Sequence, residues 1–300
     1  MTATAAGEGA KGAGAPLTDA NQAPISSRPS FGARAARTPA FVAGAVLTSV
    51  LLLLAVLAPV IGRYSPVQQN LLATLQGPSA AHWLGTDEFG RDIWSRLLYG
   101  GRTDLQVGVL AVIFPFCFGS LLGTLCGYLG GWLDGIVMRV VDVVLAFPFY
   151  VLIIALVFFV GEGTHGIYIA FALTDWVVYT RTTRSAALVA VSQDWVAAAE
   201  GGGLSRSRVL FRHVMPNTIS QAIVYAMSDI VLVILAVVTL GYLGLGIQPP
   251  APDWGAMISD GQSFITVHPW LSIIPGIAVI GVGVGLSLLG DGLADLQRPR

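Results

Sequence analysis

The feature that most constrains this chain is a series of apolar runs, each long enough to cross a membrane. The first extends from Ala40 to Ile61 without a charged residue. A helix of about 20 apolar residues spans a hydrocarbon core of about 30 Å. Further runs of this kind lie near residues 104–129, 140–160, 166–187, 219–247 and 271–293. The sequence therefore predicts an all-α polytopic membrane protein with six transmembrane helices.

The composition excludes an ordinary soluble protein. Charged residues make up 11% of the chain and hydrophobic residues 54%, and the mean hydropathy is +0.73; soluble domains carry about 25% charged residues. Residues 1–36 are instead rich in Ala, Gly, Pro and Ser, so we expect a disordered cytoplasmic tail before a transmembrane domain over 37–300. The first apolar run is too long for a signal peptide, which favours an uncleaved first helix.

The distribution of positive charge predicts how the spans are oriented. With the N-terminus inside, the segments on the inner side hold twelve of the sixteen Lys and Arg residues, and those on the outer side hold four. The inner residues are Lys11, Arg28, Arg34, Arg37, Arg139, Arg181, Arg184, Arg206, Arg208, Arg212, Arg298 and Arg300. The outer residues are Arg63, Arg91, Arg96 and Arg102. Because cytoplasmic loops carry the excess of Lys and Arg, we expect both termini in the cytoplasm.

A polar, arginine-bearing segment, residues 188–218, joins the fourth and fifth predicted spans. Residues 195–200 favour a helix, which meets three glycines at 201–203. Ser205 is suited to cap a second short helix, and Pro216 is expected to stop it. The pattern predicts a helix, a turn and a helix held between two spans. An ordinary basic loop is the alternative.

The first predicted outer loop contains a run of acidic and basic residues, HWLGTDEFGRDIWSR, over 82–96. We expect a tight turn at Gly85 and then a short amphipathic helix, whose aspartates and arginines pair at the membrane surface. An enzymatic alternative would use His82, Asp87 and Glu88 as acid–base groups. A solvated loop lacks the burial that tunes catalytic groups, so the structural interpretation is favoured.

Two further patterns concern how the spans pack and bend. The second span carries glycines at every fourth position, which let helices approach closely: Gly119, Gly123 and Gly127. At the start of the third span, Arg139 and Asp142 have the i,i+3 spacing of an ion pair on one helix face. Pro148 is expected to kink this third span.

Five motifs, in order, resemble the C-type permease subunits of the dipeptide/oligopeptide/nickel group of ABC importers. Residues 197–217 resemble the "EAA" coupling loop, with Ala197-Ala198-Ala199 in place of Glu-Ala-Ala and Gly203 at the fixed glycine. The others are the outer-loop run from 82, MRVVDVVLAFP from 138, GYLGLGIQPPAPDWG from 241 and LLGDGLAD from 288. The resemblance covers residues 37–300.

This resemblance implies the type I importer permease fold, with six transmembrane helices and a cytoplasmic coupling helix. It implies a permease subunit of an ATP-driven importer in the bacterial cytoplasmic membrane. The expected partners are a second, homologous permease subunit in a heterodimer, two ATPase domains or subunits, an extracytoplasmic binding protein and membrane lipid; nucleic acid is not expected. The solute stays open among dipeptides, oligopeptides, nickel chelates and other small solutes.

The resemblance also implies which residues act. Those expected to couple to the ATPase are Ala197, Ala198, Ala199, Glu200, Gly203, Ser205, Arg208, Arg212, His213 and Pro216. Those expected in the outer loop and gate are Gly85, Thr86, Asp87, Gly90, Arg91, Asp92, Pro249, Pro250 and Trp254. Ala197 departs from the family's glutamate, and Glu200, three residues on and on the same helix face, can carry the carboxylate instead.

Two polar residues are expected inside the membrane, Asp142 and Asp229. An ionised carboxylate at Asp229 that faced lipid would cost about 2.5–3.5 kcal/mol. We therefore expect Asp229 to face the permease partner or the transport path, or to be satisfied by Ser228 or a neighbouring helix.

The chain lacks the motifs of an energy source or a catalytic centre. It has no GxxxxGK[ST] phosphate loop, and its single lysine, Lys11, lies in the tail. It also has no HExxH, no GxSxG and no Cys/His pattern with zinc spacing. We therefore expect no catalytic residue, metal or cofactor here, with ATP and Mg bound by partner ATPases. An ion-coupled secondary transporter with Asp229 at its ion site is the alternative, whereas an intramembrane enzyme would lack a plausible catalytic pair.

Overall fold

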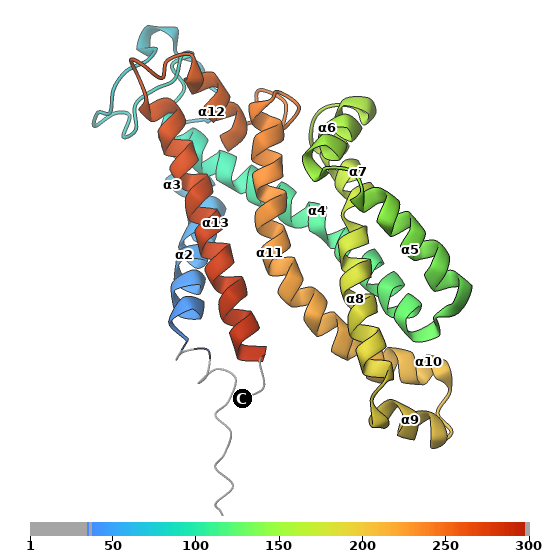
Figure 1. Ribbon diagram of the computed structural model, residues 1–300. Helices are drawn as coiled ribbons and strands as arrows, with labels where there is room; N and C mark the ends of the chain where they lie inside the picture. The colour runs from blue at the N-terminus through green and yellow to red at the C-terminus, as the bar shows by residue number, and fades with distance from the viewer. Residues whose placement is uncertain (1–34, 36–37, 298–300) are drawn as a thin grey trace, which may run out of the picture.

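The computed structural model describes residue 35 and residues 38–297, and the regular elements of this part are helices (Figure 1). The tail expected over residues 1–36 lies outside the described residues, apart from residue 35. In chain order the helices are α2 (Pro39–Val56), α3 (Ala58–Ile61), the 3₁₀ turn η1 (Leu71–Ala73), α4 (Ile93–Leu129), α5 (Gly131–Leu145), α6 (Phe149–Val160), α7 (Thr164–Thr174), α8 (Trp176–Val191), α9 (Asp194–Gly201), α10 (Arg206–Val209), the π-helical turn η2 (Leu210–Val214), α11 (Met215–Tyr242), α12 (Trp254–Gln262) and α13 (Trp270–Gln297).

Four helices of the described chain are long and apolar enough to cross a membrane. They are α2, α4, the continuous helix Arg206–Tyr242 and α13. A fifth span results if α5 and α6, which are bent by 91° at the break between them, are counted together. The all-helical membrane fold is therefore confirmed with four to five candidate spans. The fourth predicted span, residues 166–187, is divided in the structure between α7 and α8.

The outer-loop run does not form the separate amphipathic helix that we expected. Instead, α4 begins at Ile93 and continues unbroken through the second predicted span to Leu129. Asp92 caps its first turn, because its Oδ2 accepts hydrogen bonds from the backbone N and the hydroxyl of Ser95, both at 2.8 Å. A capped start and no proline before Pro115 let one helix extend from the loop into the bilayer.

The third predicted span is bent more strongly than a kink. Leu145 ends α5, Pro148 lies immediately before α6, and the two helix axes differ by 91°. Proline disfavours helix in the residue before it and cannot donate a backbone hydrogen bond, so the break follows from the sequence. The expected Arg139–Asp142 ion pair is wrong, since Asp142 is exposed and none of the ion pairs of the described residues joins the two.

Pro216 does not stop the second short helix, contrary to our prediction. Helix α10 passes through η2 into α11, so the fifth span begins far earlier than residue 219. Pro216 lies in the first turn of α11, where its missing N–H is tolerated, and the π-helical turn directly precedes it. The helix then ends at Tyr242, and Gly244 turns the chain with a positive φ of 79°.

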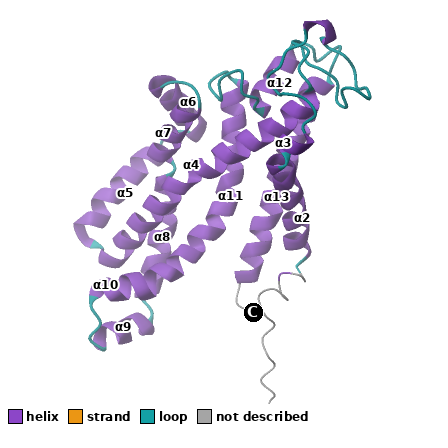
Figure 2. Ribbon diagram, turned by 180° about the vertical axis from the view of Figure 1, so that it is seen from behind, coloured by secondary structure: helices purple, strands orange, loops and turns teal. Residues whose placement is uncertain are grey.

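Two apolar clusters share α4 and α11, and the helices that contribute to them can be followed in Figure 2. One lies among α4, α6, α7, α8 and α11, and the other among α2, α4, α11, α12 and α13. The predicted glycine ladder packs α4 on α8, since a Cβ on each glycine would collide with the backbone of that helix. The glycines Gly119, Gly123 and Gly127 face, in turn, the carbonyls of Trp176, Thr180 and Arg184.

The polar segments lie at opposite ends of the helices. The loops on either side of η1 gather with α12 at one end, whereas α9 and α10 lie at the other (Figure 1). The start of α2 and the end of α13 point toward the α9 end. The fold therefore separates two candidate sites along the length of the bundle.

Candidate functional site

We call residues 63–92 together with residues 248–269 the loop cap. At its centre Asp87 is 7% exposed and accepts backbone hydrogen bonds from Phe89 (3.0 Å) and Arg91 (2.9 Å) through Oδ1. Its Oδ2 pairs with Arg91 Nε at 2.6 Å and with Arg96 Nε at 3.4 Å. One buried carboxylate thus organises the turn and forms ion pairs with two arginines, which confirms the predicted pairing of aspartate and arginine.

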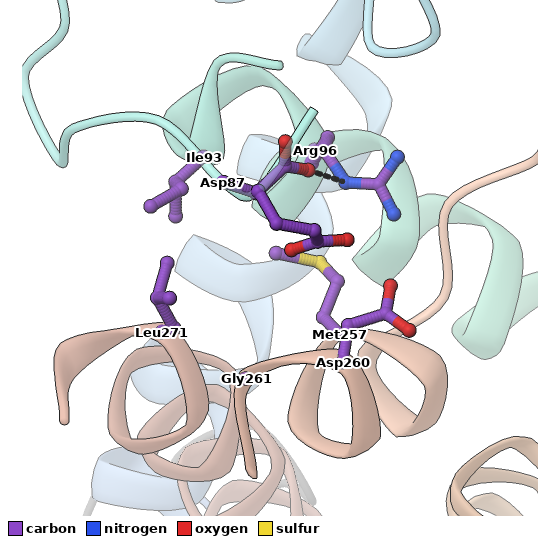
Figure 3. Close-up of a pocket in the computed structure, with 8 residues that line it drawn as sticks. Asp87, Ile93, Arg96, Met257, Asp260, Gly261 and Leu271 are labelled. Carbon is purple, nitrogen blue, oxygen red and sulfur yellow. Dashed lines mark ion pairs between the residues drawn. The ribbon is translucent and has the colours of Figure 1, made fainter. Parts of the chain in front are cut away.

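Arg91 also connects the loop to α12. Its Nη2 lies 3.2 Å from Glu88 Oε1 and 3.6 Å from Asp260 Oδ2. Burial raises the pKa of Glu88 and the pKa of Asp260, although Arg91 partly opposes each shift. Figure 3 shows the small hollow between these elements, with the Asp87–Arg96 ion pair on one side and Asp260 and Met257 of α12 on the other.

The remaining loop residues hold the turn in shape. Gly85 and Gly90 have positive φ angles of 82° and 69°, which favour glycine. Thr86 is fully buried, and its hydroxyl accepts from Gln76 N at 2.9 Å and donates to the carbonyl of Ala73. The loop is therefore far more buried than a solvated surface loop, and this corrects our expectation.

Asp92 completes this group of loop residues. Besides capping α4, its Oδ1 lies 2.9 Å from Nδ1 of His82. The tight turn predicted at Gly85 is confirmed, and the structure brings all six predicted loop residues into one folded turn: Gly85, Thr86, Asp87, Gly90, Arg91 and Asp92.

Pro249, Pro250 and Trp254, which were predicted together as residues of the outer loop and gate, occupy different environments. The two prolines, joined by a cis peptide bond, are exposed, whereas Trp254 is 4% exposed. Its backbone N donates to Asp104 Oδ2 and its Nε1 to the carbonyl of Leu97, both at 2.9 Å. Trp254 therefore fixes α12 to α4.

A buried carboxyl pair lies beneath Trp254 and was missed by the sequence analysis. Asp104 and Asp253 are 0% and 1% exposed, and one oxygen of each has no hydrogen-bond partner. Asp253 caps α12 by accepting from Ala256 N at 2.9 Å, and burial raises its pKa to about 6. An acid at the first residue of a predicted span was the signal that could have drawn attention to Asp104.

At the other end, the 188–218 segment forms the predicted helix and turn. Helix α9 ends at Gly201, and Gly203 adopts a positive φ of 82°, which makes the turn to Ser205 at the start of α10. A small apolar core holds the segment, and its buried members are Ala187, Ala190, Val196, Val209 and Val214.

Most of the predicted coupling residues of this segment face outward from that core. Ala199 and His213 are half-buried. The exposed ones are Ala197, Ala198, Glu200, Gly203, Ser205, Arg208, Arg212 and Pro216. Most of these residues are therefore accessible at the α9 end of the bundle.

Glu200 has an intramolecular partner that the sequence did not indicate. Its Oε1 accepts a hydrogen bond from the hydroxyl of Tyr128, at the end of α4, at 2.7 Å. Tyr128 also packs against the small apolar core of the segment. The carboxylate of Glu200, which lies three residues after the position of the family's glutamate, is thus held against α4.

Asp229 is buried inside the helix bundle, and its partners belong to the same chain. It is 2% exposed, and its Oδ2 accepts from the hydroxyl of Tyr179 on α8 at 2.8 Å. Satisfaction by a neighbouring helix, one of our alternatives, is therefore confirmed; the partner Ser228 is not used. The sequence analysis did not predict Tyr179 as the hydrogen-bond donor to Asp229, nor that Asp175 is buried. It also did not predict the ion pair between Arg184 of α8 and Asp134 of α5.

Comparison with known proteins identifies the chain. The family model described as "Binding-protein-dependent transport system inner membrane component" matches residues 119–300. The dipeptide transport system permease protein DppC of Alkalihalophilus pseudofirmus is 39% identical over 259 residues, covering 86% of this chain and 85% of that protein. The oligopeptide permease OppC of Bacillus subtilis is 34% identical, covering 86% and 84%.

A third relative, the glutathione transport system permease protein GsiD of Pectobacterium atrosepticum, is 36% identical and covers 75% of each chain. The family model covers more than half of this chain, and the relatives cover most of it. The chain therefore belongs to the binding-protein-dependent inner membrane component family: it is a multi-pass permease subunit of an ABC importer, not itself an enzyme, that works with a separate ATPase and a binding protein.

Proposed function

We propose that this permease carries short peptides, of the size of dipeptides to oligopeptides or glutathione, through the inner membrane. One observation supports this most: relatives similar over most of their length are named as dipeptide, oligopeptide or glutathione permeases. Family membership also removes the ion-coupled secondary transporter as an alternative.

The proposed topology has six spans with both chain ends in the cytoplasm. The spans are α2 with α3, α4, α5 with α6, α7 with α8, the helix ending in α11, and α13. An even number of spans returns the chain to its starting side, which agrees with the start of α2 and the end of α13 lying at the same end (Figure 1). The excess of Arg and Lys in the segments on that side supports a cytoplasmic location.

Reporter fusions test this topology directly. Fusions at Gly163 and Asp260 should report the outside, and a fusion at Ser205 should report the cytoplasm. A cytoplasmic signal at Asp260 would overturn the arrangement and the roles that depend on it.

In this orientation the 188–218 segment is the coupling surface and the loop cap faces the binding protein. The chain pairs with a second, homologous permease, and ATP-driven closure of two ATPase subunits or domains pushes on the exposed residues around α9. This push opens the path outward, and hydrolysis resets the inward state. The surface transmits a signal only if it contacts the two ATPase states differently.

A pair of glycine substitutions tests the coupling role. Gly203→Leu forces a side chain into a positive φ that L-residues rarely adopt, whereas Gly201→Leu introduces the same side chain in α9 without that strain. No atom lies within 4 Å of a Cβ at either position, so clashes do not confuse the comparison.

We expect Gly203→Leu to uncouple ATP hydrolysis from uptake of a labelled dipeptide, or to weaken co-purification of the ATPase, with normal membrane insertion. Gly201→Leu should change these quantities much less. Equal behaviour of the two variants would contradict a specific role for the turn. Glu200→Arg, measured beside them, tests whether the displaced carboxylate also meets the ATPase.

A further inference from the structure

The turn that joins α4 to α5 packs against one arginine of α8. Helix α4 ends at Leu129, and α5 begins at Gly131. Arg184 of α8 donates from Nε to Asp134 Oδ1 and from Nη2 to Asp134 Oδ2, the second bond at 2.7 Å. The carbonyl oxygen of the same arginine would lie 2.6 Å from a Cβ on Gly127 of α4. Arg184 therefore contacts both the end of α4 and the start of α5.

The ion pair between Arg184 and Asp134 has the geometry of a strong contact. Two hydrogen bonds join the guanidinium to both oxygens of the carboxylate, which fixes orientation as well as distance. The two side chains are 26% and 18% exposed, so water screens this pair less than an ordinary surface pair. None of the other ion pairs among the described residues involves either group. The pair is thus suited to hold α5 in a fixed position on α8.

Helix α5 has few other buried contacts along its length. Of its 15 residues, all of which the structure describes, only Val141 is buried, whereas Trp132 is 78% exposed. Both ends of the helix are joints. Gly130 and Gly131 at its start have positive φ angles of 62° and 68°, and no atom lies within 4 Å of a Cβ at either position. Pro148 follows its end at the 91° break before α6. The ion pair therefore has a large share in setting the position of α5.

The same turn is also connected to the 188–218 segment. Helix α8 continues from Arg184 for two further turns to Val191, and α9 begins at Asp194. Tyr128, at the end of α4, donates its hydroxyl to Glu200 of α9 at 2.7 Å. The end of α4 and the start of α5 are thus bonded through side chains to both α8 and α9. A movement of the 188–218 segment reaches α5 through these contacts.

We propose that Asp134 and Arg184 are positioning residues of the transport cycle. The proposal rests on the coupling role given above to the 188–218 segment. The ion pair makes α5 follow α8 when the ATPases move that segment, and the glycines between α4 and α5 let the angle between these helices change. The break at Pro148 ends the movement before α6, which packs on α7 with the rings of Phe149 and Phe171 6.2 Å apart. Without the pair, ATP hydrolysis would continue while α5 no longer follows, so less solute would be carried per ATP.

Distances between spin labels on α5 and α8 of the purified, assembled transporter test the movement. The exposed Cys117 is replaced by serine, and labelled cysteines replace Ile136 of α5 and Leu188 of α8, both of which are exposed. With the native ion pair we expect one narrow distance distribution that is the same without nucleotide and with ATP and vanadate. In Asp134→Asn the distribution should broaden or differ between the two nucleotide states, because α5 is released from α8.

Dipeptide uptake and ATP hydrolysis, measured on the same preparation, give the second readout. Asp134→Asn should lower the uptake per ATP hydrolysed several-fold. Arg184→Lys keeps the charge but loses the two-pronged contact, so its loss should be intermediate. Exchange of the two charges, Asp134→Arg with Arg184→Asp, should restore part of the ratio, and failure to restore any of it would contradict the proposal. Glu162→Gln, at an exposed acid between α6 and α7, should leave the ratio unchanged.

Two further results would overturn the proposal. One is the same response of the label distance to ATP in the native pair and in Asp134→Asn. The other is a normal uptake per ATP in Asp134→Asn with only a lower melting temperature, which would make the pair a purely structural contact. If Asp134→Asn does not assemble, Arg184→Lys decides both measurements. Absence of dipeptide uptake by wild type would instead contradict the peptide assignment, and the label distances, which need only the assembled transporter and ATP, would still decide whether the pair positions α5.

Discussion

The loop cap and the 188–218 segment are the two polar ends of the molecule, and they are built in opposite ways. In the loop cap, charged side chains are buried and paired, as with Asp87, Arg91 and Arg96. In the 188–218 segment the arginines are exposed, and a small apolar core with one hydrogen bond from Tyr128 supports the surface.

This difference shows at which end the charged groups are satisfied within the chain and at which end they are left for a partner. A buried charge network must be satisfied within the chain, because an unpaired buried charge is strongly destabilising. Exposed arginines and a short helix need no internal partner and remain free to bind another protein. Substitutions should therefore affect stability at the loop cap and coupling at the 188–218 segment.

The largest effect is expected from Asp87→Ala in the loop cap. The change leaves the buried side chains of Arg91 and Arg96 without their shared carboxylate, a loss of about 3–5 kcal/mol for a broken buried pair. Thermal unfolding of the purified complex measures it. Glu162→Ala, at an exposed acid between α6 and α7, is the control. Similar melting temperatures for the two variants would mean that the loop cap is not held by its charges.

Trp254→Ala should be the next most harmful change. The ring is buried against Gly100 and Gly101 of α4, and truncation of a buried tryptophan costs about 3 kcal/mol or more. We expect a lower melting temperature and faster proteolysis of the loop around α12. Trp132→Ala, at a residue 78% exposed, should change neither, and an equal loss in both variants would contradict the proposed anchor.

A smaller effect concerns pH. The pKa of Asp253 is raised from 3.8 to about 6 by burial. A carboxyl whose folded-state pKa lies above its unfolded value stabilises the fold below about pH 4, and this contribution is lost as the pH rises toward about 6. Asp253→Asn keeps a cap for α12 but removes the titration.

The melting temperature of wild type, relative to Asp253→Asn, should therefore fall as the pH rises through this window. Glu88, whose pKa is also raised and which does not interact with Asp253, remains in both proteins and cancels in the comparison. The negative charge of Asp260 raises the pKa of Asp253, so this interaction is part of the difference that is measured. A constant difference between the two proteins across the window would show that Asp253 does not titrate there.

The smallest effect on stability is expected from Tyr128→Phe in the support of the 188–218 segment. It removes one hydroxyl that donates to the exposed Glu200, so the melting temperature should not change measurably. The ratio of transport to ATP hydrolysis should fall, and Glu200→Gln should weaken the same contact. Tyr150→Phe, on an exposed tyrosine of α6, is the matched control. If Tyr128→Phe lowered the melting temperature as much as Asp87→Ala does, the proposed contrast between a loop cap that stabilises the fold and a segment that serves coupling would be wrong.

Much of the architecture could be predicted because it depends on local rules. Apolar length indicated the spans, glycine spacing indicated a close helix contact without showing that α8 makes it, and Gly203 indicated the turn after α9. The errors arose where a neighbouring element decided the outcome. Pro216 was expected to end a helix, but the π-helical turn before it allows the helix to continue. The loop around Asp87 was expected to be solvated, but α12 covers it.

The sequence by itself determined that this chain is an all-helical membrane permease, because apolar runs and family motifs are properties of adjacent residues. Only the tertiary structure decided which partners the buried acids have. Asp104 and Trp254 are far apart in the chain, as are Tyr179 and Asp229, and each pair is brought together by the packing of α4, α8, α11 and α12. Burial and charge pairing depend on which helices lie side by side, and no local pattern encodes this.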